Sequence, residues 1–254
     1  DISSSGATLN TSGSFYGNYT YDSDYNFFRP LFKAIDDKHR LSTWKGRPTF
    51  AAFVDKKRVV FNLDHIIAVF SASDGTFTIL AGPHIRMRGR FYIDTLDETT
   101  HVYYPGKKWE NVDGGRDVAT IGRCMIVDGD IVEVEPLQIP GYEEATCLLE
   151  GGPASWKGLD GLYVGVYEPP TQGAIVHGQR KFEYTSRPYR MIQTDQHILC
   201  AWADGCVTVH DTNLTLSHTI GAHTKPVTDV RLIRQNLWTT SKDRTLKMRD
   251  FSSP

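Results

Sequence analysis

The 254-residue chain has little of several features that would assign it to a specialised class of protein. Its four cysteines are few for a disulfide-stabilised scaffold of this size. No apolar run approaches the roughly 20 residues that a membrane-spanning helix needs. The formal net charge is −2, so nothing attracts the whole chain to nucleic acid or to an anionic membrane. An apolar content of 40 % is ordinary for a globular protein.

The motifs of the common enzyme classes are also missing. The chain has no H-E-x-x-H, no G-x-S-x-G, no glycine-rich phosphate loop and no paired C-x-x-C. Its nine histidines include no pair at the i, i+4 spacing that would place two metal ligands on one helix face. We therefore expect no catalytic residue, no metal site and no cofactor.

Two of the cysteines allow a test of disulfide formation. If Asp204-Gly205 forms a two-residue hairpin turn, Cys200 lies opposite Val209. The thiols of Cys200 and Cys206 then point to opposite faces of the sheet, because side chains alternate along a strand. They could then not bond. This favours a reduced protein inside the cell, nuclear or cytoplasmic. The contrary hint is a set of three N-x-S/T sequons, at Asn10, Asn18 and Asn213.

The chain divides into a short polar start and one long domain. Residues 1–25 contain mostly Ser, Thr, Gly, Asn and Tyr, which indicates a tail or linker, with room for one closing strand over Phe15–Tyr21. Since the chain opens without Met or a signal-like segment, we expect a trimmed domain or a processed product. Residues 26–254 form the main domain. Within it, Phe27–Arg40 fits either a helix or a strand over Leu31–Ile35, and we favour the strand.

Hairpin signals dominate the main domain. Two apolar strands flank Asp74-Gly75 in Ile66–Leu80, and the same design recurs around Asp204-Gly205 in Ile198–Asp211. Asp243-Arg244 occupies the same place in Leu237–Asp250. Asp-Gly favours a tight turn because glycine reaches positive φ without steric cost. Weaker turns are predicted at Lys45–Pro48, Pro105–Lys107, Asp128–Asp130 and Pro169–Gly173.

The turns recur at a nearly constant spacing. Asp128, Glu168, Asp204 and Asp243 are separated by 40, 36 and 39 residues. A period near 40, with two strands around each turn, is typical of the blades of a β-propeller. We therefore predict an all-β propeller of six or seven blades, with seven preferred.

The last two repeats resemble WD40 units. "GAHTKPVTDVRLI" followed by "TTSKDRTLKMRD" supplies the Gly, His, apolar strand, Ser/Thr and Asp of such a unit, at Gly221, His223, Val227–Ile233, Thr240, Ser241, Asp243, Thr245, Leu246, Met248 and Asp250. The resemblance implies a chain of hydrogen bonds that joins His, Ser/Thr, Asp and Trp in each blade. Here the tryptophan position holds Arg249 and His210 in the last two matching units and Leu80 in the unit around Asp74-Gly75. We expect that chain to end before its last member, which makes this a divergent WD40-like propeller.

A narrower resemblance lies upstream of the turn at Asp204-Gly205. "GQRKFEYTSRPYRMI" with the hairpin after it is similar to a stretch of the Bub-type mitotic-checkpoint and Rae-type mRNA-export propellers, and "RLSTWKG" around Trp44 is similar to their first blade. Members of that family bind an extended peptide (the GLEBS motif) of a partner such as a checkpoint kinase. Their glutamate-binding arginine corresponds to Arg187. Pro188 replaces the usual Cys after it, and Lys45 replaces Asp after Trp44.

These observations predict a non-enzymatic scaffold that binds a peptide motif of a protein partner on one face. The resemblance implies a kinase-like or pseudokinase-like partner, a hetero-complex and a place at the kinetochore. We expect Arg187, Tyr184 and Tyr189 to contact the partner, together with Trp202 and Trp44. The alternative for Arg187 is an ion pair with a local carboxylate.

Two other functions remain open at this point: a secreted or lumenal propeller that acts on glycans, and an RNA-binding propeller. "IRMRGR" places Arg86, Arg88 and Arg90 on one strand face, as a phosphopeptide or nucleic-acid patch or as a charged outer strand.

Overall fold

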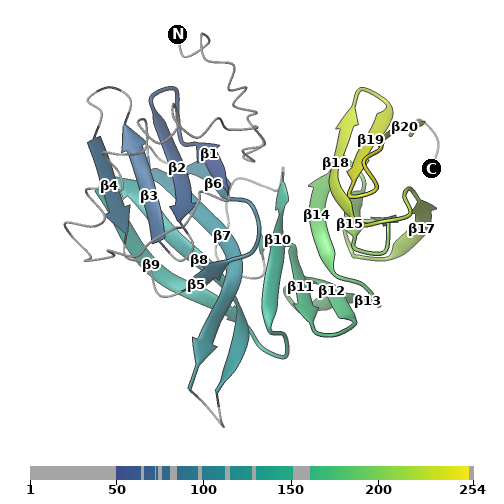
Figure 1. Cartoon of the computed structure of the whole chain (residues 1–254), viewed down its shortest axis with the longest axis horizontal. Helices are drawn as coiled ribbons and strands as arrows, with labels where there is room; N and C mark the ends of the chain where they lie inside the picture. The colour runs from purple at the N-terminus through teal and green to yellow at the C-terminus, as the bar shows by residue number, and fades with distance from the viewer. Residues whose placement is uncertain are drawn as a thin grey trace.

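The computed structural model describes residues 50–63, 66–71, 73, 76–80, 85–96, 99–111, 115–127, 130–150 and 161–251, and the elements in these ranges are β-strands (Figure 1). No helix in the same ranges is long and apolar enough to span a membrane. The strands are β1 (Ala51–Phe53), β2 (Arg58–Leu63), β3 (Ile66–Ser71), β4 (Thr76–Leu80), β5 (Ile85–Met87), β6 (Tyr92–Leu96), β7 (Thr99–Glu110), β8 (Arg116–Val127), β9 (Asp130–Ile139), β10 (Glu144–Glu150), β11 (Val164–Glu168), β12 (Gln172–His177), β13 (Arg180–Tyr184), β14 (Pro188–Gln193), β15 (Ile198–Trp202), β16 (Cys206–His210), β17 (Leu216–Gly221), β18 (Val227–Ile233), β19 (Asn236–Ser241) and β20 (Leu246–Asp250).

The strands form five antiparallel units, which we call sheet 1 (β1–β4), sheet 2 (β5–β9), sheet 3 (β10–β13), sheet 4 (β14–β17) and sheet 5 (β18–β20). Sheets 3 and 4 are joined because their first strands, β10 and β14, pair in parallel at Leu149–Met191. In Figure 1, sheets 1 and 2 lie on one side of β10 and sheets 4 and 5 on the other. The predicted all-β class is confirmed. Five sheets lie in the described ranges, and the total of six or seven blades stays a prediction.

Apolar layers between successive sheets form the core. One layer joins sheets 1 and 2, a second joins sheets 2, 3 and 4, and a third joins sheets 4 and 5. Strand β15 shows how the sequence achieves this, because Ile198, Cys200 and Trp202 face sheet 3 whereas Leu199 and Ala201 face sheet 5. All five side chains are fully buried. A continuous apolar run therefore serves two interfaces at once, through the two-residue period of a strand.

The turn at Asp204-Gly205 forms as predicted, but with one more residue. Cys200 pairs with Thr208 and not with Val209, so Ala203 joins Asp204 and Gly205 in a three-residue loop. Gly205 provides the left-handed conformation that such loops need, with φ of 95°. The expectation that the thiols of Cys200 and Cys206 face opposite sides is therefore wrong. In this register Cys206 lies opposite Trp202, which shares its face of β15 with Cys200, so both thiols are on one face of the sheet. Both cysteines are nevertheless free.

The turn at Asp243-Arg244 repeats this geometry. Thr240 pairs with Leu246, which leaves a loop that ends at Arg244 in the position of Gly205. Arg244 adopts φ of 68°, and its N–H donates to the carbonyl of Ser241 at 3.1 Å. A residue that carries a Cβ is strained in this region. The 39-residue spacing between Asp204 and Asp243 thus corresponds to two turns of the same geometry.

The prediction of a turn at Pro105–Lys107 is wrong, because Pro105 lies inside the 12-residue strand β7. On one side β7 pairs continuously with β8, and on the other side its neighbour changes from β6 to β5 near Pro105. The Pro105 carbonyl accepts a hydrogen bond from the N–H of Arg88 at 2.9 Å, so the absent N–H of proline would point to that same side. Proline is tolerated where a strand has no ladder partner for its N–H.

The other predicted turns divide into described and undescribed ones. Strand β8 ends at Val127 and β9 begins at Asp130, while β11 ends at Glu168 and β12 begins at Gln172, so both hairpins are confirmed. Strands β3 and β4 likewise flank Asp74-Gly75. The tail 1–25 and its boundary with the main domain, the closing strand over Phe15–Tyr21, Phe27–Arg40 and the turn at Lys45–Pro48 lie outside the described residues.

A β-bulge recurs near the start of the first strand of three sheets. The register shifts by one residue at Thr146 in β10, at Tyr189 in β14 and at Thr228 in β18. A bulge leaves one residue out of the ladder and turns its side chain away from the regular alternation. Cys147, Arg190 and Asp229 follow the three bulges and hold equivalent positions.

We expect Arg244→Gly to stabilise the protein by roughly 0.5–1 kcal/mol, because glycine removes the left-handed strain at the cost of a more flexible unfolded chain. Arg244 is exposed, so little packing is lost. Urea unfolding of the wild type, Arg244→Gly and Arg244→Ala would measure this. Alanine keeps a Cβ in the strained conformation and should leave stability unchanged; a glycine variant no more stable than the alanine variant would contradict the prediction.

Candidate functional site

Three of the residues predicted to bind a partner lie at the junction between sheets 3 and 4. Tyr184 ends β13, Arg187 lies between β13 and β14, and Tyr189 is the bulged residue of β14. All three side chains are partly exposed. Trp44 lies outside the described residues. The structure thus brings together the three neighbours that the sequence singled out.

Arg187 is held by charge and by two aromatic rings. Its Nη2 lies 2.8 Å from Oε2 of Glu144, and its guanidinium carbon lies 5.9 Å and 5.5 Å from the ring centres of Tyr167 and Tyr189. The Oε1 atom of Glu144 lies 3.0 Å from Nε of Arg88. One carboxylate therefore joins two arginines. Arg187 retains 27 % side-chain exposure, which leaves part of the guanidinium accessible to solvent.

The bulge at Tyr189 connects this junction to sheet 5. Because Pro188 pairs with Trp202 and Arg190 with Ala201, Tyr189 is released from the ladder. The Nζ atom of Lys242 lies 5.4 Å from the centre of the Tyr189 ring and donates to its hydroxyl at 3.4 Å. Cations above tyrosine rings are attracted by the ring quadrupole. The Tyr189 ring therefore contacts two cations, Arg187 from the segment before β14 and Lys242 from the turn of sheet 5.

Trp202 takes a different place from the one expected of a surface anchor. Its side chain is fully buried, and the Tyr184 ring packs on it with 4.6 Å between ring centres. Burial, with a contribution from Asp204, raises the pKa of Tyr184. Any part that Trp202 takes in binding is therefore indirect, through the support that it gives to Tyr184.

A buried polar chain lies beneath these rings. The indole N–H of Trp202 donates to Oγ1 of Thr208 at 2.7 Å, and Nε2 of His210 lies 2.8 Å from the same oxygen. The Phe182 ring meets His210 edge-on, with 4.3 Å between ring centres. Burial lowers the pKa of His210 to about 4, so the imidazole is neutral at pH 7. In sheet 4 the residue at the tryptophan position thus joins a polar chain of its own.

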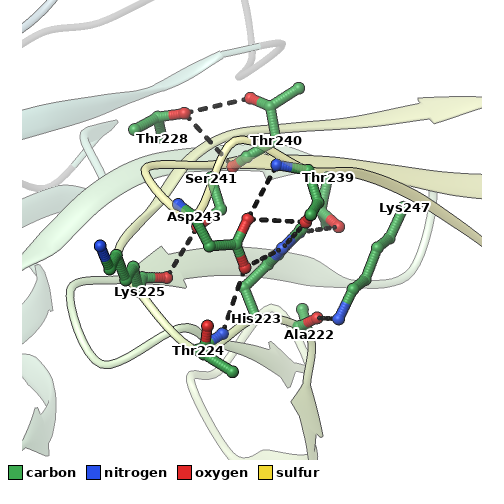
Figure 2. Close-up of polar contacts among 11 residues, drawn as sticks. Ala222, His223, Thr224, Lys225, Thr228, Thr239, Thr240, Ser241, Asp243 and Lys247 are labelled. Atoms are coloured by element: carbon green, nitrogen blue, oxygen red, sulfur yellow. Dashed lines mark hydrogen bonds and ion pairs between the residues drawn. The ribbon is translucent and has the colours of Figure 1, made fainter.

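The turn that carries Lys242 is fixed by the network that the WD40 resemblance implies (Figure 2). His223 lies 3.0 Å from Oδ2 of Asp243 through Nδ1 and 2.9 Å from Oγ1 of Thr239 through Nε2. Oδ1 of Asp243 accepts from the hydroxyl of Thr245 at 2.6 Å, and the hydroxyl of Ser241 donates to the carbonyl of Lys225 at 2.9 Å. The hydrogen bonds from Thr245 and then His223 lower the pKa of Asp243 against the effect of desolvation. The network ends at Thr239.

Arg249 confirms the expected break in this network. It lies opposite Leu237 on β20 and is exposed. The side chains of β20 are exposed along its whole length, with 61 % for Leu246 and 57 % for Met248. In the described part of the chain β20 pairs with β19 alone. An arginine is suited to this exposed position, where an indole would not be buried.

The arginines of "IRMRGR" do not share one strand face, because β5 ends at Met87. Gly89 allows the bend: a Cβ there would lie 2.1 Å from the carbonyl oxygen of Thr146. Arg86 is exposed, whereas Arg88 reaches Glu144 and Arg90 reaches Asp229 at 3.2 Å. The patch on one outer face that the sequence suggested is therefore wrong. The glycine at position 89 was the sequence signal for this bend, because a residue with a Cβ would not fit there.

Sequence reasoning missed three residues of the junction, namely Glu144, Tyr167 and Lys242. Their positions follow from the repeat, since Glu144 begins β10 as Pro188 begins β14, and Tyr167 and Lys242 adjoin equivalent turns. Over the described ranges, no group of three or more His, Cys, Asp and Glu side chains could hold a metal ion.

Comparisons with known proteins bear on the fold. No family model and no curated protein sequence matches the chain. Among solved structures, the WD40 β-propeller domain of Doa1 is similar with a TM-score of 0.53 and 14 % identity, over 79 % of this chain and 64 % of that one. Raptor of Chaetomium thermophilum gives 0.57 and 12 %, over 80 % and 20 %. BamB from Moraxella catarrhalis gives 0.50 and 12 %, over 82 % and 59 %.

The chain thus spans less than two thirds of each of these three proteins. At such identities the likeness concerns the fold. With the repeated turns and the His223 network, it shows a divergent WD40-like β-propeller.

The depressed pKa of His210 predicts how stability depends on pH. Below pH 6.5 the unfolded chain takes up a proton on this histidine, but the folded protein does so only near pH 4. The free energy of unfolding should therefore decrease as the pH falls through this window. His210→Gln should show a smaller decrease between pH 7 and pH 4 in urea unfolding, whereas His218→Gln should keep the wild-type dependence. Equal pH dependence in His210→Gln and wild type would refute this assignment.

Proposed function

We propose that this protein is a non-catalytic interaction scaffold, and that it binds an acidic peptide segment of a partner protein at the junction around Arg187, Tyr189 and Lys242. The observation that carries the proposal is the pair of cations on one partly exposed tyrosine. Arg187 and Lys242 belong to neighbouring sheets, and both contact the Tyr189 ring. An arginine–aromatic cluster that bridges two structural units is typical of interaction hot spots.

Arg187 can bind a second carboxylate beside Glu144. A guanidinium has five N–H donors in a planar fork, and the ion pair with Glu144 is made through Nη2. The rings of Tyr167 and Tyr189 hold the fork in place before any partner arrives. Binding to a group that is already ordered loses little side-chain entropy, which favours affinity.

Contacts between adjacent turns make the surrounding surface rigid. The N–H of Ala203 donates to the carbonyl of Arg187 at 2.9 Å, and the N–H of Asp204 donates to Oγ of Ser186 at 3.0 Å. The N–H of His223 donates to the carbonyl of Gly205 at 2.9 Å. The turns of sheets 4 and 5 are thereby tied to the segment that carries Arg187. Loops fixed in this way present a preorganised surface to an extended peptide.

The finer proposal is an intracellular adaptor of the mitotic-checkpoint kind, acting within a hetero-complex with a kinase-like or pseudokinase-like protein. Arg187 supports it, since this residue matches the glutamate-binding arginine of the Bub-type and Rae-type propellers. Four free cysteines in the structure agree with a reducing compartment.

The interaction is tested by native co-purification with tagged full-length variants, followed by quantitative mass spectrometry. We expect Arg187→Glu and Lys242→Glu to reduce recovery of the same partner at least tenfold, because each places a negative charge where an acidic peptide binds. Arg180→Glu, on the exposed strand β13, is the matched control and should retain the partner. Melting temperatures confirm that the variants are folded.

A partner recovered equally with both junction variants would reject this site. Lys242→Glu is needed beside Arg187→Glu because a glutamate at position 187 also faces Glu144. The compartment is checked separately on the natural protein. Asn213 is exposed at a turn, so a glycan found there by mass spectrometry would replace the intracellular assignment with a secretory one.

A further inference from the structure

Four side chains form a row in which aromatic rings and cations alternate across three sheets. The ring centre of Tyr167, on sheet 3, lies 5.9 Å from the guanidinium carbon of Arg187, which lies 5.5 Å from the ring centre of Tyr189. The Nζ atom of Lys242, on sheet 5, lies 5.4 Å from the centre of the Tyr189 ring. Steps of this size match at most about five residues of an extended peptide, at about 3.3 Å per residue. We call these four residues the junction row.

The end of the row at sheet 5 continues into exposed cations. Lys242 and Arg244 flank Asp243 in the sequence, but the Asp243 carboxylate bonds to His223 and keeps only 11 % side-chain exposure (Figure 2). Lys242 and Arg244 are exposed, and in the described part of the chain neither pairs with a carboxylate. The Lys-Asp-Arg sequence therefore presents two positive charges at the surface and keeps its negative charge in the network.

A neighbouring loop adds a third cation at this end. The N–H of Lys242 donates to the carbonyl of Pro226 at 3.0 Å, and the hydroxyl of Ser241 donates to the carbonyl of Lys225 at 2.9 Å. These bonds hold the loop before β18 against the turn after β19. The Lys225 side chain is exposed, and it too has no carboxylate partner among the described residues. We call Lys225, Lys242 and Arg244 the basic end.

The opposite end of the row carries negative charge. Glu168 follows Tyr167 directly, ends β11 and is partly exposed. At the turn of sheet 4, Asp204 is exposed, and its Oδ1 accepts from the N–H of Cys206 at 3.0 Å, which fixes the carboxylate. Neither carboxylate forms an ion pair with a cation of the described ranges. The surface charge therefore changes from negative at the turns of sheets 3 and 4 to positive at the turn of sheet 5.

We propose that this charge gradient fixes the direction and the charge pattern of the bound peptide, an inference that rests on the acidic-peptide role proposed above. One acidic residue of the partner contacts Arg187, further acidic residues follow toward the basic end, and basic or uncharged residues lie over Glu168 and Asp204. Complementary charge fixes the register of a complex, and like charges placed together oppose the wrong one. The partner segment is therefore acidic at one end only.

The preference is tested with three labelled eight-residue peptides of equal composition: four glutamates followed by four lysines, the reverse order, and an alternating form. Binding to the full chain is measured by fluorescence anisotropy at low ionic strength, because salt screens exposed charges. We expect one or both segregated peptides to bind at least about threefold more tightly than the alternating one. Lys225→Glu and Arg244→Glu should each remove this preference. Lys56→Glu, exposed in the hairpin of sheet 1, is the matched control and should keep it.

The direction is read by zero-length coupling with a carbodiimide, which joins a carboxylate to an amine. In the complex with the tighter segregated peptide, the peptide glutamates should couple to Lys225 and Lys242, and the peptide lysines to Glu168. Mass spectrometry of the digested complex identifies the joined residues. Coupling to Lys56 as frequent as coupling to the basic end, or absence of coupling at both ends of the row, would overturn the proposal.

The outcomes separate this inference from the binding site on which it rests. Binding that Arg187→Glu weakens, but that is equal for segregated and alternating peptides, would overturn the gradient and leave the site intact. Peptide binding unaffected by Arg187→Glu would reject the site itself, and with it the inference. Absence of binding by all three peptides would also overturn the inference. A thymidine oligonucleotide that displaces the peptide at a lower concentration than unlabelled peptide does would assign the basic end to nucleic acid instead.

Discussion

The structure depends on the burial of both faces of its middle sheets. Met191 and Ile192 of β14 illustrate the constraint, since Met191 belongs to the apolar layer shared with sheets 2 and 3 and Ile192 to the layer shared with sheet 5. A sheet packed on both faces has no solvent side on which polar residues could collect along its strands. Polar and charged chemistry is therefore displaced to the turns and to the first residues of the inner strands, where Glu144 and Asp229 each meet arginines.

The repeated bulge explains why these ion pairs form there. Each bulge shifts the alternation by one residue, so the residue before it and the residue after it no longer obey one pattern. Tyr189 is released toward the surface, while Arg190, next in sequence, turns into the space beside β18, where it meets Asp229. Neighbouring residues of β14 thus contribute to two different charge groups. The sheet keeps its hydrogen bonds, and the bulge supplies the change in direction.

Local signals in the sequence predicted much of the fold and less of the site. Turn residues and the 40-residue period are local, so the hairpins around Asp204 and Asp243 could be placed before the structure was known. The strand through Pro105 could not, because its tolerance depends on a change of neighbour from β6 to β5 that only tertiary structure defines. Arg187 was recognised, but Glu144 lies 43 residues earlier and Lys242 55 residues later, and sequence alone does not state which charges meet.

The parallel pairing of β10 with β14 also constrains the order of assembly. Leu149 and Met191 are 42 residues apart, and the residues between them include the hairpins of sheet 3. Closing so long a loop in an open chain is entropically costly, but the cost falls once the hairpins have shortened the path. Formation of the sheet 3 hairpins before β14 pairs is therefore the order that loop-closure entropy favours. The contacts of Tyr189 and Arg190 both need β14 in place, so the same order would complete them after sheet 3.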